Sequence, residues 1–143
     1  MEVNGYKIEP GADLTRAVLT EANLAGANLR NAILSGVFME GADLTGADLT
    51  GANLPYINLR GANLSGANLS GAILYGADLY YANLTGANLI GTNLEGTILE
   101  GVNLSYADLT GANLTGTYLV GATLTGVTMP DGKPYDDPNK MEP

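Results

Sequence analysis

Leucine recurs at every fifth position of this chain from Leu14 to Leu124, in one unbroken register. A methionine takes its place at Met39, and Met129 closes a series of 24 five-residue units. Two residues before each of these positions stands a small side chain, which is Ala in 17 units, and one residue before stands Asn or Asp in 16 units. Five residues are too few to bury their own apolar side chains, so the units must stack on copies of themselves.

A period of five residues excludes the ordinary secondary structures. In an α-helix, five residues advance by about 500°, so successive leucines would never form one stripe. In a flat strand, an odd period would send every second leucine to the opposite face. The pattern instead predicts a chain that is extended across each Ala-Asx-Leu triplet, with Ala and Leu inward, and that turns a corner before the next triplet. Gly stands at this corner in 18 units, as a tight turn favours.

The residues that replace Asx before the central leucine indicate the length of one coil. Before the last two units they are Val18, Ile33, Phe38, Ile73, Ile98 and Tyr118. If one coil holds four units, they fall on two adjacent sides, Ile33 and Ile73 on one and the other four on the next. If one coil holds three units, they scatter over all three sides. The sequence therefore predicts an all-β square solenoid of about six coils, each of four pentapeptides. One inward column should comprise Leu24, Leu44, Leu64, Leu84 and Leu104.

Six corners carry another residue in place of Gly. They are Arg16, Glu21, Asn31, Tyr56, Tyr81 and Tyr106. Because side chains with a Cβ resist positive φ, we expect most of these residues, and the tyrosines especially, to have negative φ. Successive tyrosines of this set are separated by one coil and one side. We therefore expect the three tyrosines to climb around the molecule rather than stack in one line.

The repeated unit resembles A(D/N)LXX, the signature of the pentapeptide-repeat family, from Gly11 to about Met129. The resemblance implies a right-handed quadrilateral β-helix with the central Leu and the preceding small residue inward. On this basis residues 11–130 form the β-helix. Residues 1–10 are an N-terminal cap segment, in which Val3, Tyr6 and Ile8 lie across the first coil as a short strand. Residues 131–143 are a polar, Pro-rich C-terminal tail that terminates the coil.

Composition argues against several classes of function. The chain has no Cys and no His, which removes the commonest zinc ligands and the usual general base, so we expect no enzyme, no metal and no cofactor. The formal charge of −9 argues against nucleic acid and anionic membranes as partners and permits a basic partner. No apolar run approaches the length of about 18 residues that spans a bilayer. Residues 1–10 lack the apolar region of a signal peptide, so we expect a cytoplasmic protein.

The remaining candidates for function are departures from the repeat on the outer surface. An exposed apolar and aromatic patch of this kind has the composition of a protein contact surface. Its members are Phe38, Tyr56, Tyr75, Tyr80, Tyr81, Ile98 and Tyr118. The alternative is that isolated surface hydrophobic residues are ordinary and stack along β ladders. The sequence thus indicates a non-catalytic structural or interaction module whose partner is an unidentified protein or a second copy of the chain.

The resemblance brings one other function, because some family members mimic DNA and bind DNA gyrase through an acidic rod. Six coils at the usual strand spacing make a rod roughly 29 Å long. Duplex DNA of that length carries about 17 phosphates, against nine net charges here. Gyrase binding by DNA mimicry therefore remains the second hypothesis.

Overall fold

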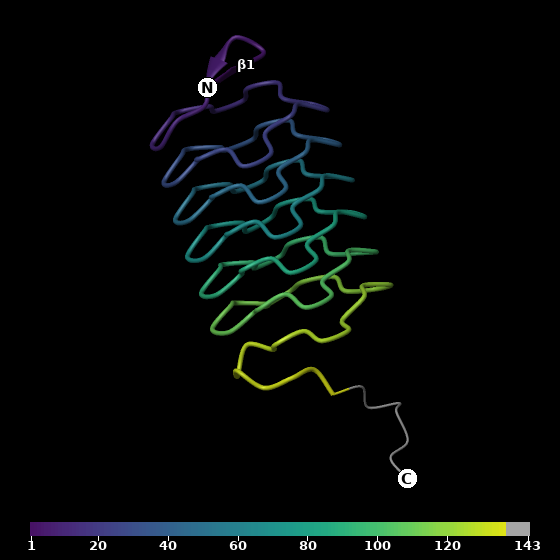
Figure 1. Cartoon of the computed structure of the whole chain (residues 1–143). Coiled ribbons are helices and arrows are strands. Elements are labelled where there is room, and N and C mark those ends of the chain that lie inside the picture. Colours follow the sequence, from purple (N-terminus) through teal and green to yellow (C-terminus); the bar gives the residue numbers. More distant parts are fainter. Residues whose placement is uncertain (137–143) are drawn as a thin grey trace.

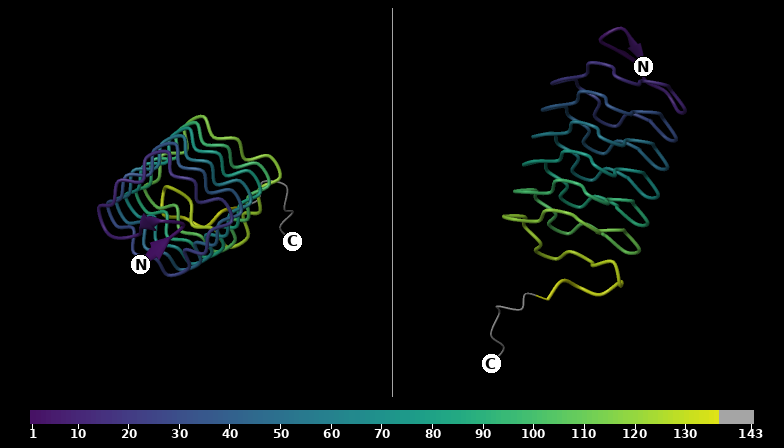
Figure 2. Two further views of the ribbon diagram at one scale, coloured as in Figure 1. Left: turned by 90° about the horizontal axis from the view of Figure 1, so that it is seen from above. Right: turned by 180° about the vertical axis from the view of Figure 1, so that it is seen from behind.

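A computed structural model of the protein describes residues 1–136, which form an elongated stack of coils (Figure 1). Outside one N-terminal hairpin, the coils are joined by single parallel bridges between residues 20 positions apart, from Asp13 with Ile33 to Asp108 with Thr128. This spacing equals four pentapeptides, so the coil length inferred from the residues that replace Asx is confirmed. Seen along its axis, the stack has a four-sided outline (Figure 2). The described residues contain no helix long and apolar enough to cross a membrane.

Each side of the stack carries one outward column of residues that repeats every 20 positions. The first side runs through Asp13 and Ile33, the second through Val18 and Phe38, the third through Asn23 and Asp43, and the fourth through Asn28 and Asp48. Residues two positions apart within a side point the same way, as in any extended chain. The Ala and Leu of every unit therefore share the interior, while the Asx between them faces out.

The five-residue unit satisfies all of its backbone donors. In residues 43–47, the N–H groups of Asp43, Leu44 and Gly46 donate to carbonyls of the adjacent coils at 2.9, 2.7 and 3.0 Å. The Ala47 N–H closes the corner on the Leu44 carbonyl at 2.9 Å. The remaining N–H, of Thr45, donates to Oδ1 of Asp43 at 3.0 Å. The Asx side chain thus supplies the one acceptor that the neighbouring coils do not provide.

This contact explains why Asn and Asp dominate the outward position. The Oδ1 atom of every Asx in the repeat accepts the N–H two residues later, with the exception of Asn53. Two residues after Asn53 stands Pro55, which has no N–H to donate. The columns of Asx are therefore structural, as an Asx near a turn usually is.

The interior is a column of leucine and alanine layers. The expected inward leucines Leu24, Leu44, Leu64, Leu84 and Leu104 are all buried. Three threonines replace inward alanines, and each finds a carbonyl acceptor. Thr92 Oγ1 donates to Leu69 at 2.8 Å, Thr97 Oγ1 to Leu74 at 3.0 Å, and Thr117 Oγ1 to Leu114 at 3.0 Å. Among the described residues no buried side-chain polar atom lacks a hydrogen bond.

The expectation of negative φ at the non-glycine corners is wrong. Their φ values run from +57° at Tyr56 to +62° at Tyr106, close to the +64° to +74° of the corner glycines from Gly26 to Gly126. The ladder explains the difference. The Tyr56 N–H donates to the Tyr75 carbonyl at 3.1 Å in the same pattern as the corner glycines, and this bond requires one corner geometry in every coil. The hydrogen bonds between stacked coils therefore override the preference of an L residue for negative φ, which costs roughly 1 to 2 kcal/mol at each non-glycine corner.

The corner residues also obey a rule from one coil to the next, and the structure supplies its physical reason. Each non-glycine corner is followed by Gly at the same place in the next coil. The side chain of the first lies over that Gly, so a Cβ added at Gly76 would meet the Tyr56 ring at 2.5 Å, and one at Gly101 would meet the Tyr81 ring at 2.8 Å. Tyr56, Tyr81 and Tyr106 thus cover three different corners, and their expected climb around the stack is confirmed.

A hairpin closes the N-terminal end, where a single strand was expected. Strands β1 (Glu2–Val3) and β2 (Tyr6–Lys7) pair antiparallel around Asn4 and Gly5, whose φ values of 52° and 83° suit a tight hairpin turn. Val3 and Tyr6 pack on the first coil, and Ile8 is buried. The Tyr6 hydroxyl accepts the N–H of Val18 at 3.3 Å, which takes the place of the carbonyl that a preceding coil would supply.

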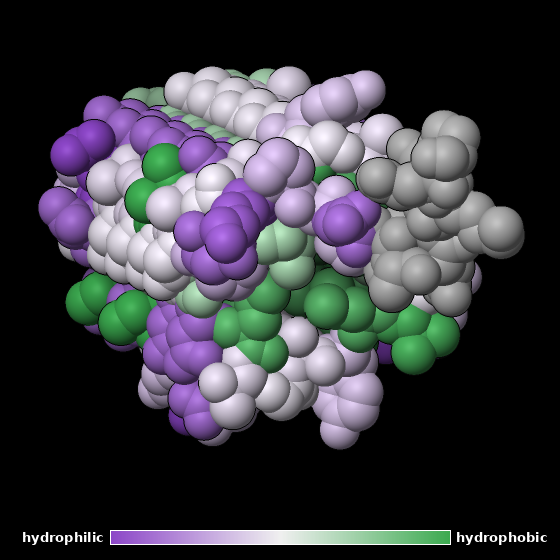
Figure 3. All heavy atoms as spheres, turned by 90° about the horizontal axis from the view of Figure 1, so that it is seen from below, coloured by the Kyte–Doolittle hydropathy of each residue, from purple (hydrophilic) through white to green (hydrophobic). Residues whose placement is uncertain are grey.

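The C-terminal end is closed on the fourth side. Residues 131–135 fold back antiparallel, so the Met129 N–H donates to the Lys133 carbonyl at 2.7 Å and the Tyr135 N–H to the Val127 carbonyl at 2.8 Å. The interior leucines of the last coil, Leu114, Leu119 and Leu124, are only partly buried. Figure 3, a view onto this end, shows hydrophobic atoms at the surface. The rest of the expected tail, residues 137–143, lies outside the described part.

Candidate interaction surface

The second side departs most from the repeat. We call this side, together with the corners at its two edges, the aromatic surface. Its outward column is Val18, Phe38, Asn58, Asp78, Ile98 and Tyr118. Tyr118 and Phe38 are well exposed and Ile98 is half-buried. Two polar residues, Asn58 and Asp78, separate Phe38 from Ile98, so the apolar members do not form one continuous strip.

The apolar outward residues lose a hydrogen bond that the repeat normally makes. With Phe38 in place of an Asx, the N–H of Glu40 has no acceptor among the described residues, and the same holds for Glu100, which follows Ile98. An Asn at either position would supply the missing bond. The sequence thus gives up a local contact on this side and exposes an apolar side chain, a conflict with the fold that is typical of functional surfaces.

Four tyrosines of the expected patch form two separate pairs. The Tyr56 and Tyr75 rings lie edge to face at the corner between the first and second sides, with centroids 5.4 Å apart and planes at 86°. Tyr80 and Tyr81 do the same at the other edge of the second side, at 4.4 Å and 74°. Residues 77–79 cross the second side between the two corners, which keeps the pairs apart.

The pair of Tyr80 and Tyr81 already binds a cationic side chain of the protein itself. The Arg60 guanidinium carbon lies 4.6 Å from the centroid of the Tyr80 ring, and Nη1 lies 3.2 Å from Oδ2 of Asp78. Arg60 and Tyr80 stand at the same place in successive coils, so the two share a column. We name Arg60, Asp78, Tyr80 and Tyr81 the occupied tyrosine pair.

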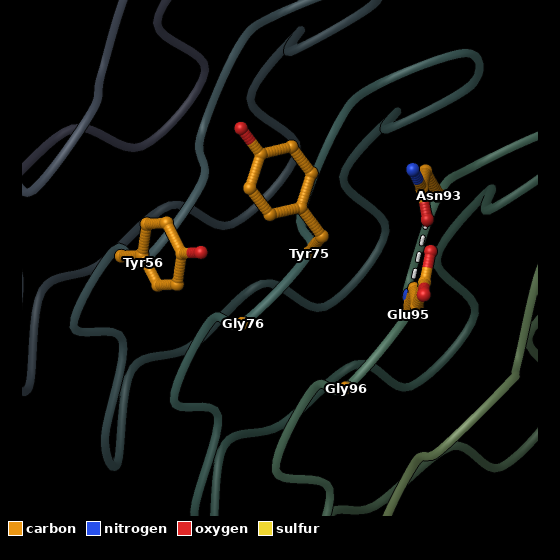
Figure 4. A pocket seen from close by; sticks show the side chains of 6 residues that line it. All are labelled: Tyr56, Tyr75, Gly76, Asn93, Glu95 and Gly96. Atoms are coloured by element: carbon orange, nitrogen blue, oxygen red, sulfur yellow. Dashed lines mark hydrogen bonds between the residues drawn. The ribbon is translucent and has the colours of Figure 1, made fainter.

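The other pair borders an open pocket of about 530 Å³. Figure 4 shows Tyr56 and Tyr75 on one part of its rim, with Asn93 and Glu95 on the next coil of the same face. The corner glycines Gly76 and Gly96 complete the lining, and a Cβ at Gly96 would meet nothing within 4 Å. Sequence reasoning missed Glu95. The 20-residue period could have predicted its position, because Glu95 occupies the same place in its coil as Tyr75 does in the coil before, and so lies directly below it.

The acidic residues with perturbed pKa lie mostly away from the aromatic surface. Hydrogen bonds from the Thr two residues later, first from its hydroxyl and then from its N–H, lower the pKa of Asp13, Asp43 and Asp108. The pKa of Asp48 is lowered by the Thr50 hydroxyl in the same way, with a smaller effect of Arg30. These carboxylates serve the Asx turns. In residues 1–136 no three acidic side chains converge as metal ligands.

Comparison with known families agrees with this architecture. The profile of the family described as pentapeptide repeats matches eight copies, over residues 10–36, 42–80, 77–116 and 99–129. The chain belongs to the pentapeptide-repeat family. Proteins of this family are generally structural or interaction modules rather than enzymes.

Solved structures of the family resemble this pentapeptide-repeat protein. HetL of the cyanobacterium Nostoc sp. strain PCC 7120, involved in regulation of heterocyst differentiation, is 38% identical over 87% of this chain and 65% of its own, with a TM-score of 0.37. A protein of the Arabidopsis thaliana thylakoid lumen is 32% identical over 69% of this chain and 67% of its own, with a TM-score of 0.45. QnrB1, a plasmid-mediated fluoroquinolone resistance protein, is 24% identical over 82% of this chain and 60% of its own, with a TM-score of 0.41.

This pentapeptide-repeat protein therefore spans less than two thirds of HetL and of QnrB1. No curated protein sequence matches it.

Proposed function

We propose that the protein is a non-catalytic interaction module, a right-handed rod of about six coils that presents the aromatic surface to a protein partner. One observation carries the proposal. Outside the last two units, every apolar replacement of an outward Asx falls on the first or second side. The third and fourth sides keep their Asx columns and the hydrogen bonds that go with them. Apart from those two units, the loss of Asx is thus confined to two adjacent sides.

The exposed members of the surface suit a contact of moderate size. Phe38 and Tyr56 are 49% and 70% exposed, so both have area to bury against a partner. Aromatic side chains anchor interfaces because they bury a large area at little cost in conformational entropy. The rod holds them on bonded coils rather than on a loose loop, which lowers the entropy that binding must overcome.

A photo-crosslinking experiment in the native host tests the proposal. The crosslinking residue p-benzoylphenylalanine is placed at Phe38, and in a control at Ile90, which is also exposed and apolar but lies at the corner between the fourth and first sides, outside the aromatic surface. We expect one discrete protein adduct from position 38 and none from position 90. Sedimentation of the purified protein then decides whether the adduct joins two copies of the chain.

A matched pair of double variants adds the second test. Replacing Phe38 and Tyr80 with Ser should abolish the adduct, measured with the crosslinker at Tyr118, and should leave the far-UV spectrum unchanged. The control replaces Ile90 and Tyr106, which are also one apolar residue and one tyrosine, with Ser. This double variant should still form the adduct. Equal adducts from positions 38 and 90, or equal effects of the two double variants, would mean that the aromatic surface has no special role.

DNA mimicry remains the less supported function. Most outward residues of the third and fourth sides are Asn rather than Asp, so these sides carry few charges. The acidic residues there, Asp43, Asp48 and Asp108, are engaged by their own Asx turns. A supercoiling assay with purified gyrase separates this function from the first.

A further inference from the structure

The two tyrosine pairs of the aromatic surface share an edge-to-face contact, although Tyr80 and Tyr81 are neighbours in one coil and Tyr56 and Tyr75 come from successive coils. Both hold their rings edge to face, at 86° for Tyr56 with Tyr75 and at 74° for Tyr80 with Tyr81. Both have a carboxylate on the same face, Glu95 beside the first pair and Asp78 beside the second. The occupied pair also holds the Arg60 guanidinium, which touches both the ring of Tyr80 and the carboxylate.

The pocket at Tyr56 and Tyr75 has no such cation in the described structure. The ion pairs within residues 1–136 are those of Arg30 with Asp48 and of Arg60 with Asp78, so neither involves Glu95. Arg16 shares the corner column of the pocket, but its side chain lies near Gly36, three coils before Gly96 and so about 14 Å away. Glu95 and the two tyrosines therefore line an open space of about 530 Å³.

The floor of the pocket keeps this space free. Gly76 and Gly96 are both at positive φ, and neither carries a side chain that would fill the space between the rings and Glu95. The Tyr56 ring lies over Gly76, against the coil below. A planar group can therefore approach a ring face and the carboxylate together, as Arg60 does at the occupied pair.

From this internal comparison we infer that the pocket of Tyr56, Tyr75 and Glu95 receives an arginine side chain of the partner protein. The guanidinium stacks on a tyrosine ring and pairs with Glu95, in the arrangement that Arg60 shows with Tyr80 and Asp78. Arginine fits better than lysine because its planar group can stack on a ring and present two N–H groups to a carboxylate at once. The net charge of −9 favours the approach of a basic segment. The inference rests on the proposed function and names the chemistry of the partner.

The test titrates the full chain, labelled with ¹³C in its tyrosine rings, with the peptide acetyl-Gly-Arg-Gly-amide, followed by NMR. The control peptide replaces Arg with citrulline, which keeps the shape and removes the charge. We expect saturable shifts of the Tyr56 and Tyr75 ring signals with the arginine peptide in the millimolar range, and much smaller shifts with the citrulline peptide. Equal responses to both peptides, or none at tens of millimolar, would overturn the inference.

Variants show whether the pocket is responsible. Glu95→Gln should weaken binding about threefold and Tyr56→Leu about fivefold, as expected for an exposed ion pair and one cation–π contact. Gly96→Asn should abolish binding by filling the floor, and Asn31 shows that a corner in this fold accepts Asn at positive φ. The control is Tyr106→Leu, a corner tyrosine as exposed as Tyr56, which should change nothing. Weakening by Tyr106→Leu equal to that by Tyr56→Leu would contradict the assignment.

The crosslinking experiment separates failure of this inference from failure of the proposed function. If the Phe38 position gives its adduct but the arginine peptide does not shift the rings, the surface is an interaction site and the arginine inference is wrong. If the peptide binds as expected while positions 38 and 90 crosslink alike, the arginine site stands and the broader aromatic surface is refuted.

Discussion

The rule that Gly follows every non-glycine corner in the next coil leads to a quantitative prediction. Gly76→Ala and Gly96→Ala change two corners of the same column, with φ values of +66° and +65°. Both substitutions carry the same strain of an L residue at positive φ, roughly 1 to 2 kcal/mol. They differ in what the new methyl group meets, since a Cβ at Gly76 lies 2.5 Å from the Tyr56 ring and a Cβ at Gly96 meets nothing within 4 Å.

The extra cost at Gly76 follows from the exposure of the ring. Tyr56 is 70% exposed, so its ring can swing away rather than overlap the methyl group. The ring then loses its edge-to-face contact with Tyr75, which is worth about 0.5 to 1.5 kcal/mol. We therefore expect Gly76→Ala to lower the free energy of unfolding by about 1 kcal/mol more than Gly96→Ala does.

Urea unfolding followed by circular dichroism measures the two variants, with the slope of the transition checked for constancy. A third comparison isolates the ring. When Tyr56 is first changed to Ala, adding Gly76→Ala should cost no more than Gly96→Ala, which gives a coupling of about 1 kcal/mol between positions 56 and 76. Equal costs for Gly76→Ala and Gly96→Ala in the presence of Tyr56, or no coupling, would refute the stacking of corner side chains over Gly.

Three further predictions concern the core, acid stability and gyrase. Leu64→Asp should unfold the protein, because it buries an unpaired carboxylate at several kcal/mol, whereas Asn63→Ser should be mild; a thermal melt that leaves Leu64→Asp unchanged would contradict the inward column. The lowered pKa of Asp43 and Asp108 means that the folded state favours the carboxylate, so this stability is present above the ordinary Asp pKa of about 4 and is lost as pH falls below it. Replacing both with Asn, which keeps the Asx turn, should flatten the acid limb of a melting-temperature profile, and an unchanged limb would show that other groups cause it. In a supercoiling assay, micromolar protein should leave gyrase unaffected, and inhibition that weakens when Asp43, Asp48 and Asp108 become Asn would instead support DNA mimicry.

The sequence by itself determined the plan of the coil. Period, burial and turn preference are properties of each pentapeptide, so 24 copies predict inward leucines, outward Asx and a corner after every unit. With four units per coil, the residues that replace the outward Asx place Phe38 and Tyr118 on one side. The unbroken series of bridges from Phe38 to Tyr118 confirms that placement.

Only the tertiary structure decided what happens between coils. Tyr56 adopts a φ of 57° because its ladder bond to Tyr75 forces the corner to match the glycines stacked above and below it, which a local preference cannot foretell. The tyrosines split into two pairs because the width of one side separates them, and Glu95 joins the first pair because it lies one coil below Tyr75. Contacts from one coil to the next depend on how the coils stack, whereas the repeat itself encodes only the coil.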